Sequence, residues 1–516
     1  MKRIILALLA LVLVLIQVSA LPAFSASQKP YVIAGPRGDW GFPAPLAHIK
    51  KGPGYALTSL IFDTLVWKKQ SGEFIPALAE AWEESGDGTN WRFSLNNKAK
   101  WHDGRPVTAN DVVFSINYLN ARSYPFAKLD VIESAKAVDE RTVMIKLKHP
   151  FAPFIAFVAG SMPVLPEHIY KNLDETKFSS LKAAIGSGPY KLQEYSKTHK
   201  RYVFTANPDY YAGKPLFSSI LFLKMSPGAA VKALMQGKID MMRKVPKSQV
   251  ASLNGIGLQI LETDSGHPVR LLFNHKKPLF KDLHARKGVA FALDAKKLAA
   301  IAAKGAALPN EPGGMPYSSN WKESDVQRYP YSQDKALEQF SKMGWGAGPD
   351  GKVAQDGKAV HLRLLTEKKH MGAAKVIASQ LAGLGIVVDV TSAAPNVFKS
   401  RLKSMDFDMA LASRSALGDP QNYANVVIGN NPYSDRFTAD SELVRLLEAQ
   451  AEAVSDDERL PMVKDAQKIY ARELPAYQLY TPIWFAAANG RTKVWFTKGG
   501  IGHGVPLPLN KLIFIE

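Results

Sequence analysis

The chain has 516 residues, more than one hydrophobic core accommodates, so two or three domains are expected. Hydrophobic residues make up 46% of it and charged residues 22%, as in a folded globular protein rather than a disordered or fibrous one. The formal net charge of +19 suits anionic partners, and the absence of cysteine excludes disulfides, thiolate metal sites, a cysteine nucleophile and a lipoprotein anchor.

Residues 1–27 are laid out like a secretory signal peptide. Lys2 and Arg3 form a short basic region, an unbroken apolar run follows over 4–16, and small residues with one proline follow over 18–27. The apolar run is short for a membrane span, and no other run reaches that length. We therefore expect the signal to be cleaved and the mature protein to be soluble and periplasmic; an uncleaved anchor is the alternative.

The first half of the mature chain mixes strands, turns and short helices. A strand is expected over 31–35, and a loop rich in glycine and proline leads from it into helices over 55–67 and 76–82. The other expected strands are 91–95, 99–101, 142–148, 201–206 and 218–225, and the other expected helices are 109–120, 154–160 and 228–238.

A Trp-His-Asp-Gly run lies just before the helix expected over 109–120. His102 and Asp103 side by side could serve acid–base chemistry, but Asp103-Gly104 is a hairpin-turn dipeptide. Thr108 followed by Asp111 has the spacing of a capping box at a helix start. A structural role for His102 and Asp103 is therefore favoured over a catalytic one.

From about residue 270 helices and strands alternate regularly. The expected strands are 269–275, 360–366, 386–392 and 408–413, and the expected helices are 284–303, 333–343, 371–384, 396–404, 440–453 and 456–473. Extended segments over 493–497 and 511–516 end the chain. This pattern predicts mixed α/β domains with largely parallel sheets, a boundary near 270, and a C-terminal segment that returns to the first domain.

Catalytic and cofactor signatures are absent from the sequence. It contains no P-loop, no Gly-x-Ser-x-Gly elbow, no His-Glu-x-x-His and no dinucleotide fingerprint, and its eleven histidines are scattered. We therefore expect no catalytic residues, no metal site and no cofactor. The basic residues are dispersed rather than aligned in a stripe, so no nucleic-acid binding is expected either.

A set of segments in a fixed order extends through the mature chain. They are 74–119 (beginning FIPALAEAWEE), 186–192 (GSGPYKL), 207–215 (NPDYYAGKP), 233–240 (ALMQGKID), 273–294, 343–345 (MGW), 381–390, 406–412 and 473–480 (ELPAYQLY). Together they resemble family 5 of the extracellular solute-binding proteins, the peptide-, nickel- and oligosaccharide-binding receptors of ABC importers.

The resemblance implies a fold and a partner. The fold would be the bilobed periplasmic-binding-protein fold of the cluster C type, in which two α/β lobes joined by a hinge close on a ligand. Lobe I would comprise 28–268 and 486–516, with an extra subdomain at about 70–185, and lobe II would comprise 269–485. The partner would be the importer's permease in the inner membrane, and we expect a monomer because closure needs free lobes.

Several ligand-binding residues follow from the family's loop positions. Arg37 and Trp40 lie in the loop after the first strand, and Arg414 and Asp419 lie in the loop after the 408–413 strand. Aromatic residues near the expected crossovers and in a loop rich in proline and glycine complete the set: Tyr317, Trp321, Tyr480 and Trp484.

The ligand class stays open. Peptide receptors of the family carry an Asp for the peptide's α-amino group at the position of Ala416, and Arg414 nearby would instead suit a carboxylate, phosphate or sulfonate. The candidates are therefore a peptide or an anionic amino-acid or opine-like compound, with a nickel chelate or an oligosaccharide as alternatives. An exported hydrolase reusing the lobes and a binder that serves a membrane sensor are the other functions considered.

Overall fold

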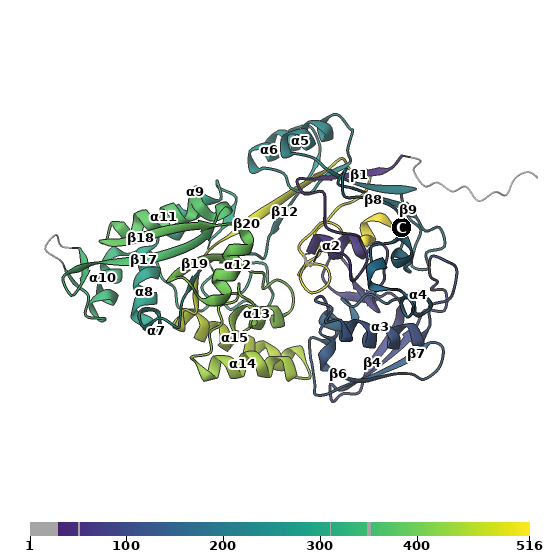
Figure 1. The fold of residues 1–516 in the computed structure, drawn as a ribbon, viewed down its shortest axis with the longest axis horizontal. Helices are drawn as coiled ribbons and strands as arrows, with labels where there is room; N and C mark the ends of the chain where they lie inside the picture. The colour runs from purple at the N-terminus through teal and green to yellow at the C-terminus, as the bar shows by residue number, and fades with distance from the viewer. Residues whose placement is uncertain (1–28, 50–51, 310, 348–351) are drawn as a thin grey trace, which may run out of the picture.

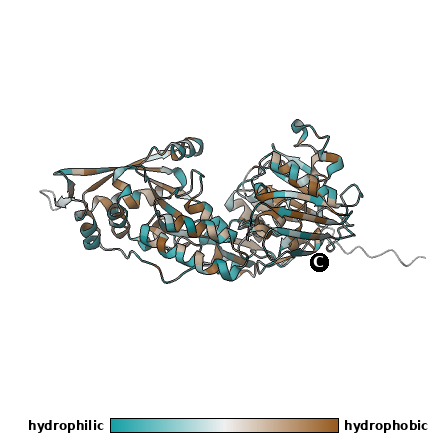
Figure 2. Ribbon diagram, turned by 90° about the horizontal axis from the view of Figure 1, so that it is seen from below, coloured by the Kyte–Doolittle hydropathy of each residue, from teal (hydrophilic) through white to brown (hydrophobic). Residues whose placement is uncertain are grey.

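The structure is a computed structural model, and it describes residues 29–49, 52–309, 311–347 and 352–516. The expected signal peptide, 1–27, lies outside these residues. Figure 1 shows two lobes lying side by side, with long strands running from one to the other. Figure 2 shows hydrophobic and hydrophilic residues alternating along the ribbons of both lobes, as expected for elements with one buried and one exposed face.

The strands, in chain order, are β1 (Tyr31–Gly35), β2 (Val66–Lys68), β3 (Phe74–Pro76), β4 (Ala79–Glu84), β5 (Asn90–Leu95), β6 (Ile132–Ala137), β7 (Thr142–Leu147), β8 (Tyr190–Ser196), β9 (Arg201–Ala206), β10 (Ser219–Lys224), β11 (Met241–Met242), β12 (Gln259–Asp264), β13 (Val269–Phe273), β14 (Ala307–Leu308), β15 (Gly346–Ala347), β16 (Val353–Gln355), β17 (Lys358–Glu367), β18 (Ile386–Ala393), β19 (Met409–Ser413) and β20 (Ala476–Ala488). The α-helices are α2 (Gly52–Thr58), α3 (Ala109–Ala121), α4 (Glu167–Tyr170), α5 (Pro227–Met235), α6 (Lys247–Gly255), α7 (Pro278–Lys281), α8 (Leu283–Ala292), α9 (Ala295–Ala302), α10 (Gln333–Ser341), α11 (Met371–Ala382), α12 (Pro395–Ser404), α13 (Pro420–Val427), α14 (Ser441–Glu452) and α15 (Asp456–Glu473).

Strand β20 joins the two lobes. Residues 476–480 of β20 pair with β13, and residues 483–488 pair with β12. Ala487 and Ala488 also pair with β11. The main sheet therefore runs β15-β16-β17-β19-β13-β20-β11-β1-β10-β9-β8 without a break. The teal β12 and the yellow β20 cross together between the lobes in Figure 1.

The prediction of largely parallel sheets is wrong. Among the described strands, only β1 with β10 and β11, and β17 with β18 and β19, pair in parallel. Antiparallel pairing arises in local hairpins, such as β8-β9-β10 and β4-β5-β7-β6, and in the pairs of β20, which returns from the far end of the chain in the opposite direction.

The sheet of the second lobe is buried on both faces. Leu271, Leu364 and Leu411 belong to a core that also contains side chains of α8, α9, α10 and α11. Their neighbours Leu272 and Leu365 belong to a separate core with side chains of α12. Successive side chains point to opposite faces of a strand, so near-continuous apolar runs are what such a sheet requires.

The hydrophobic cores follow the two lobes. One large core draws on residues from 31 to 261 and from 486 to 514, whereas another draws on residues from 269 to 480. The lobe boundaries themselves stay a prediction. Among the described residues, no helix combines the length and apolarity of a membrane span.

The Trp-His-Asp-Gly run lies between β5, a strand of the four-stranded antiparallel sheet β4-β5-β7-β6, and α3. The amide of Gly186 donates to Nδ1 of His102 (3.3 Å), and Nε2 of the same ring lies 3.0 Å from the carbonyl oxygen of Gly188. Asp103 pairs with His168 across 2.8 Å. Both side chains are therefore occupied in holding neighbouring loops together.

Several local predictions are wrong. The helix expected over 55–67 ends at Thr58 and gives way to β2, and the segment expected to be helical over 76–82 contains the start of β4. Pairing with β5 supplies the backbone hydrogen bonds of β4 and overrides its helix-favouring alanines. The helix expected over 284–303 is two helices, because Asp294 caps α9 through the amide of Lys297.

The C-terminal segments also differ from the prediction. The stretch 493–497 has no regular structure, and the stretch 511–516 contains a 3₁₀ turn over Lys511–Phe514. Asn510 opens that turn by accepting a hydrogen bond from the amide of Leu512 (3.0 Å).

Candidate ligand-binding cleft

A cavity of about 740 Å³ lies beside the crossing strands. It is lined by the loop after β1, the start of α2, the residues after β11, the crossing segments and the C-terminal loop: Pro36, Arg37, Trp40, Gly52, Pro53, Arg243, Lys244, His267, Trp484, Phe496, Val505, Pro506, Leu507 and Pro508. Its volume falls in the range of sites that enclose a small molecule.

Hydrogen bonds from the sheet of lobe I fix the loop after β1. The amide of Trp40 donates to Oη of Tyr202 (2.6 Å), and that hydroxyl donates to the carbonyl of Gly41 (2.9 Å). The hydroxyl of Tyr195 donates to Asp39 (2.7 Å). The indole of Trp40 is thus held in place as one wall of the cavity.

Three cationic side chains line the cavity, and no acidic residue is among its described lining. The guanidinium of Arg37 lies 5.7 Å from the ring centre of Trp40. Arg243 fits because residue 35 is glycine: a Cβ there would lie 2.6 Å from Nη2 of Arg243. Lys244 follows directly along the chain and is the third cation.

The electrostatics of this group leave positive charge uncompensated. Burial lowers the pKa of Arg243 to about 10. Burial, and then the charges of Arg243 and Arg37, also lower the pKa of Lys244. A bound anion would reverse these effects, because it favours the charged form of each group.

An aromatic pair from the two crossing segments forms another wall. The rings of His267 and Trp484 stack with centres 5.6 Å apart and an interplanar angle of 20°. Nζ of Lys244 lies 4.7 Å from the Trp484 ring centre. Burial, then the charges of Lys244 and Lys369, lower the pKa of His267 to about 4, so its ring is neutral at pH 7. The crossing segments therefore supply flat, uncharged surface.

Of the residues predicted from sequence, the structure brings Arg37, Trp40 and Trp484 together around this cavity. Tyr480 is buried in the core of the second lobe, with 4% of its surface exposed. Tyr317 is 45% exposed, and Nζ of Lys322 lies over its ring. Neither tyrosine lines the cavity.

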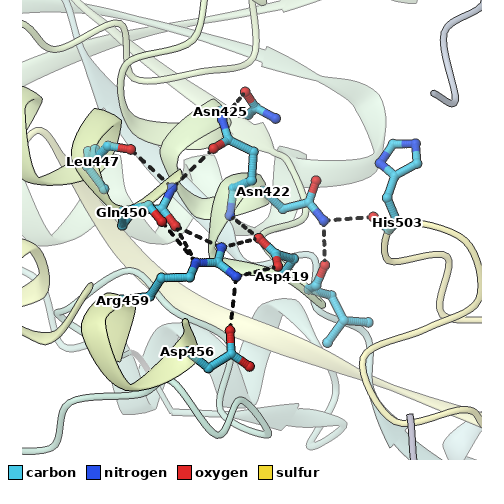
Figure 3. A network of polar contacts seen from close by, with 10 residues as sticks. Asp419, Asn422, Asn425, Leu447, Gln450, Asp456, Arg459 and His503 are labelled. Carbon is cyan, nitrogen blue, oxygen red and sulfur yellow. Dashed lines mark hydrogen bonds and ion pairs between the residues drawn. The ribbon is translucent and has the colours of Figure 1, made fainter. Parts of the chain in front are cut away.

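Asp419 and Trp321 line a second, smaller cavity of about 270 Å³ between the lobes. Both carboxylate oxygens of Asp419 accept hydrogen bonds from Arg459, at 2.7 and 3.0 Å, and Oδ1 also caps α13 through the amide of Gln421 (Figure 3). The same guanidinium bonds Gln450, and it lies 5.1 Å from the Trp321 ring centre. The carboxylate of Asp419 is thus committed to a buried arginine.

Arg414 comes directly after β19. Its Nη1 is buried, and no described group bonds it. Burial, and then the charge of Arg270, lower its pKa to about 10. Arg414 is not among the residues that line the larger cavity.

Arg243, Lys244 and His267 were not expected from sequence. The first two follow β11, a strand of only two residues whose place between β1 and β20 no local pattern reveals. His267 lies in the short connection between β12 and β13 and belongs to no sequence motif. In the part of the chain that the structure describes, no group of three or more His, Cys, Asp or Glu side chains gathers as a metal site would require.

The chain is similar to known proteins over most of its length. Residues 73–435 match the family model described as bacterial extracellular solute-binding proteins, family 5 Middle. The oligopeptide-binding protein AppA of Bacillus subtilis is 28% identical over 441 residues, which cover 79% of this chain and 78% of AppA.

Solved structures are similar over nearly the whole length. NikZ from Campylobacter jejuni in complex with Ni(L-His) has a TM-score of 0.76 at 22% identity, covering 92% of this chain and 97% of NikZ. AgaA in complex with agropinic acid, from A. tumefaciens R10, has a TM-score of 0.74 at 22% identity, covering 94% and 98%. At such identities the likeness shows the fold alone.

Proposed function

This chain belongs to family 5 of the bacterial extracellular solute-binding proteins, and we propose that it captures a small anionic solute between its lobes and delivers it to an ABC importer. Members of this family are transport receptors rather than enzymes, so the exported-hydrolase alternative does not hold. The fold is that of the cluster C binding proteins.

The observation that carries the proposal is the lining of the larger cavity. Arg37, Arg243 and Lys244 gather there without an acidic neighbour in the described lining, beside the indole rings of Trp40 and Trp484. Arginine forks bind carboxylate, phosphate and sulfonate groups through paired hydrogen bonds. Indole faces suit the carbon skeleton of an organic acid.

Peptide capture through a free amino terminus is less well supported. The side chain at the position of the amino-binding Asp is Ala416, which is 1% exposed and packed in a core of the second lobe. The cavity offers no carboxylate in its described lining. A peptide held by its carboxyl end, or a nickel ion held through an anionic chelator, would still use the three cations.

Capture would proceed by lobe closure. The hinge would lie where β12 passes into β13 and where β20 crosses, with lobe I at 28–268 and 486–516 and lobe II at 269–485. A solute that contacts both lobes favours the closed form, which the permease in the inner membrane then recognises. Removal of residues 1–27 would leave a periplasmic monomer.

Native and denaturing mass spectrometry of protein purified from its periplasm tests the proposal. We expect a mass excess that denaturation removes and that belongs to an organic acid, because tightly bound solute stabilises the folded receptor. A mixture of peptide masses would contradict the assignment of a small organic acid, and a neutral sugar would contradict an anionic solute. A stable dimer by light scattering would contradict the monomer.

The matched variants are R243Q and R445Q. Arg445 lies on the exposed face of α14, where it pairs with Glu442 at 2.7 Å. We expect R243Q to lose the mass excess and R445Q to keep it. Equal retention by both variants would remove Arg243 from the binding site.

A further inference from the structure

Two basic side chains outside the lining of the larger cavity, those of Arg414 and His503, have buried nitrogens without a described partner. Both ring nitrogens of His503 are buried, and no described group bonds either of them. Nη1 of Arg414 is in the same state. Buried nitrogens of this kind normally have a partner, so two such side chains together point to a missing one.

The position of His503 is fixed from both lobes. Its ring lies against Phe157 and Phe126, with centres 5.1 and 5.9 Å apart. Its carbonyl oxygen accepts a hydrogen bond from Nδ2 of Asn422 on α13 (2.7 Å), as Figure 3 shows. His503 stands two residues before Val505, which lines the larger cavity.

Arg414 directly follows a residue that contacts the lining of the larger cavity. The preceding residue, Ser413, donates its hydroxyl to the carbonyl oxygen of His267 (3.1 Å), and His267 lines the cavity. Nδ2 of Asn422 donates to the carbonyl oxygens of both Leu417 (2.8 Å) and His503 (2.7 Å), so the loop that follows Arg414 meets the loop that carries His503. Burial, and then the charges of Lys68 and Arg414, lower the pKa of the His503 imidazole to about 4, in keeping with this arrangement.

The described residues compensate the charge of Arg414 only in part. The acidic group that raises its pKa is Asp435, whose effect is smaller than those of burial and of Arg270. One oxygen of Asp435 is taken by Nη1 of Arg270 and the other by the hydroxyl of Tyr470 (3.1 Å). Positive charge and vacant donors thus remain together between the lobes.

We propose that Arg414 and His503 form a second anion-binding subsite, and that the solute therefore carries two oxyanion groups. One group would bind Arg37, Arg243 and Lys244, and the other would bind the fork of Arg414 and one N–H of His503. Each group is a carboxylate or a phosphate-like anion. This inference rests on the proposed function and adds the requirement for the second charge.

Three matched series of probes test the requirement: straight-chain monocarboxylates, α,ω-dicarboxylates and ω-phosphonocarboxylates of four to eight carbons. Binding would be measured by titration calorimetry and by the rise in melting temperature. We expect at least one diacid to bind roughly tenfold or more tightly than the monoacid of the same length, since a charge-assisted bond contributes about that much. The better of the two diacid series identifies the second group.

Variants separate the two subsites. R414Q and H503Q are expected to remove the advantage of the diacid and to leave monoacid binding unchanged, while R243Q weakens both. R445Q is the control and should change neither. The NMR signal of His503 gives a second reading: with the diacid bound, its titration should move to higher pH, and with the monoacid it should stay in place.

The outcomes distinguish the two proposals. If monoacids bind, lose affinity in R243Q and are matched by the diacids, the second subsite is wrong and the proposed function stands. If no acid of any series binds, both the anionic solute and the second subsite are overturned. Diacid preference that survives in R414Q and H503Q would also overturn the assignment of this subsite.

Discussion

The ion pair of Asp419 and Arg459 is a buried interaction on which one end of lobe II depends. The side chain of Arg459 is 2% exposed and that of Asp419 12% exposed. Separation of a buried pair leaves an uncompensated charge, which costs far more than loss of a surface pair. Asp419 was a ligand candidate because of its loop, but its contacts are those of a structural residue.

Replacing Asp419 by alanine should lower the free energy of unfolding by about 3–5 kcal/mol, because Arg459 would be buried without its carboxylate. Urea denaturation followed by circular dichroism measures this. The control is D456N: Asp456 also bonds Arg459, but its side chain is 77% exposed, so a loss below about 1 kcal/mol is expected. Similar losses in both variants would contradict the argument.

Buried histidines make stability depend on pH. Burial is the main cause that lowers the pKa from 6.5 to about 4 for six described histidines: His48, His102, His267, His275, His370 and His503. Between pH 6.5 and 4 the unfolded chain binds protons that the folded chain does not. The contribution of these histidines to the free energy of unfolding is therefore fully present above pH 6.5, and it is lost as the pH drops towards 4.

At pH 5.0 this loss is at most about 2 kcal/mol for each of these groups relative to pH 7.5. The measurement is the urea midpoint at the two pH values. H48Q should show a smaller difference between pH 7.5 and pH 5.0 than the parent protein, because one titrating group is gone. A midpoint that is the same at both pH values would show that the buried rings do not govern acid stability.

At the scale of elements, the turn and cap residues act largely through the backbone. Gly104 has a φ of +90°, and a Cβ there would meet nothing within 4 Å. An alanine would fit the space but not the dihedral angle. Gly255, in α6, likewise faces open space, but it has no positive φ.

We therefore expect G104A to lower stability by about 1–2 kcal/mol and G255A to leave it unchanged or raise it by up to about 1 kcal/mol. Thermal denaturation of the two variants in parallel measures the difference. The comparison isolates backbone strain, since neither substitution creates a clash. Equal melting temperatures would mean that the hairpin relaxes without cost.

Elements whose signal lies within their own sequence were predictable. The capping box of Thr108 and Asp111 opens α3 as expected, and the periodic segments α11, β18 and α12 begin and end within two residues of their predicted ranges. Elements stabilised by distant partners were not. β4 depends on β5, and β20 was not predicted as a strand because its pairing partners are remote in sequence.

The residues that line the larger cavity likewise include some that the sequence predicted and some that it did not. Arg37 and Trp40 were found because they lie in a glycine- and proline-rich loop directly after a clear strand. Arg243 and Lys244 were missed because only the neighbours of β11 in the sheet bring them to the cavity. The partnerless nitrogens of His503 have no sequence signal at all.

At the scale of the molecule, hydrogen bonds to backbone carbonyls connect the lobes in addition to the crossing strands. Asn422 donates to the carbonyl of His503 at 2.7 Å, and the amide of Ala152 donates to the carbonyl of Ala451 at 2.8 Å. Both lie outside the β-sheet crossing. They hold the lobes together while β12, β13 and β20 act as the connection.

N422A should shift the unliganded protein towards more open forms, because one bond between the lobes is lost. Small-angle X-ray scattering should report a larger radius of gyration than for the parent protein. N425A, on the same helix α13, is the control and should leave the radius unchanged. An unchanged radius in N422A would mean that other contacts determine the separation.

The late position of β20 in the chain has a consequence for biogenesis. The pairing of β20 with β13 needs residues 476–480, and its pairing with β12 and β11 needs residues 483–488. A nascent chain therefore carries both parts of the main sheet incomplete for almost the whole of translation, and its native contacts span long sequence separations, which slows folding. If residues 1–27 direct export as predicted, this delay would keep the unfolded chain competent for translocation until β20 has been synthesised.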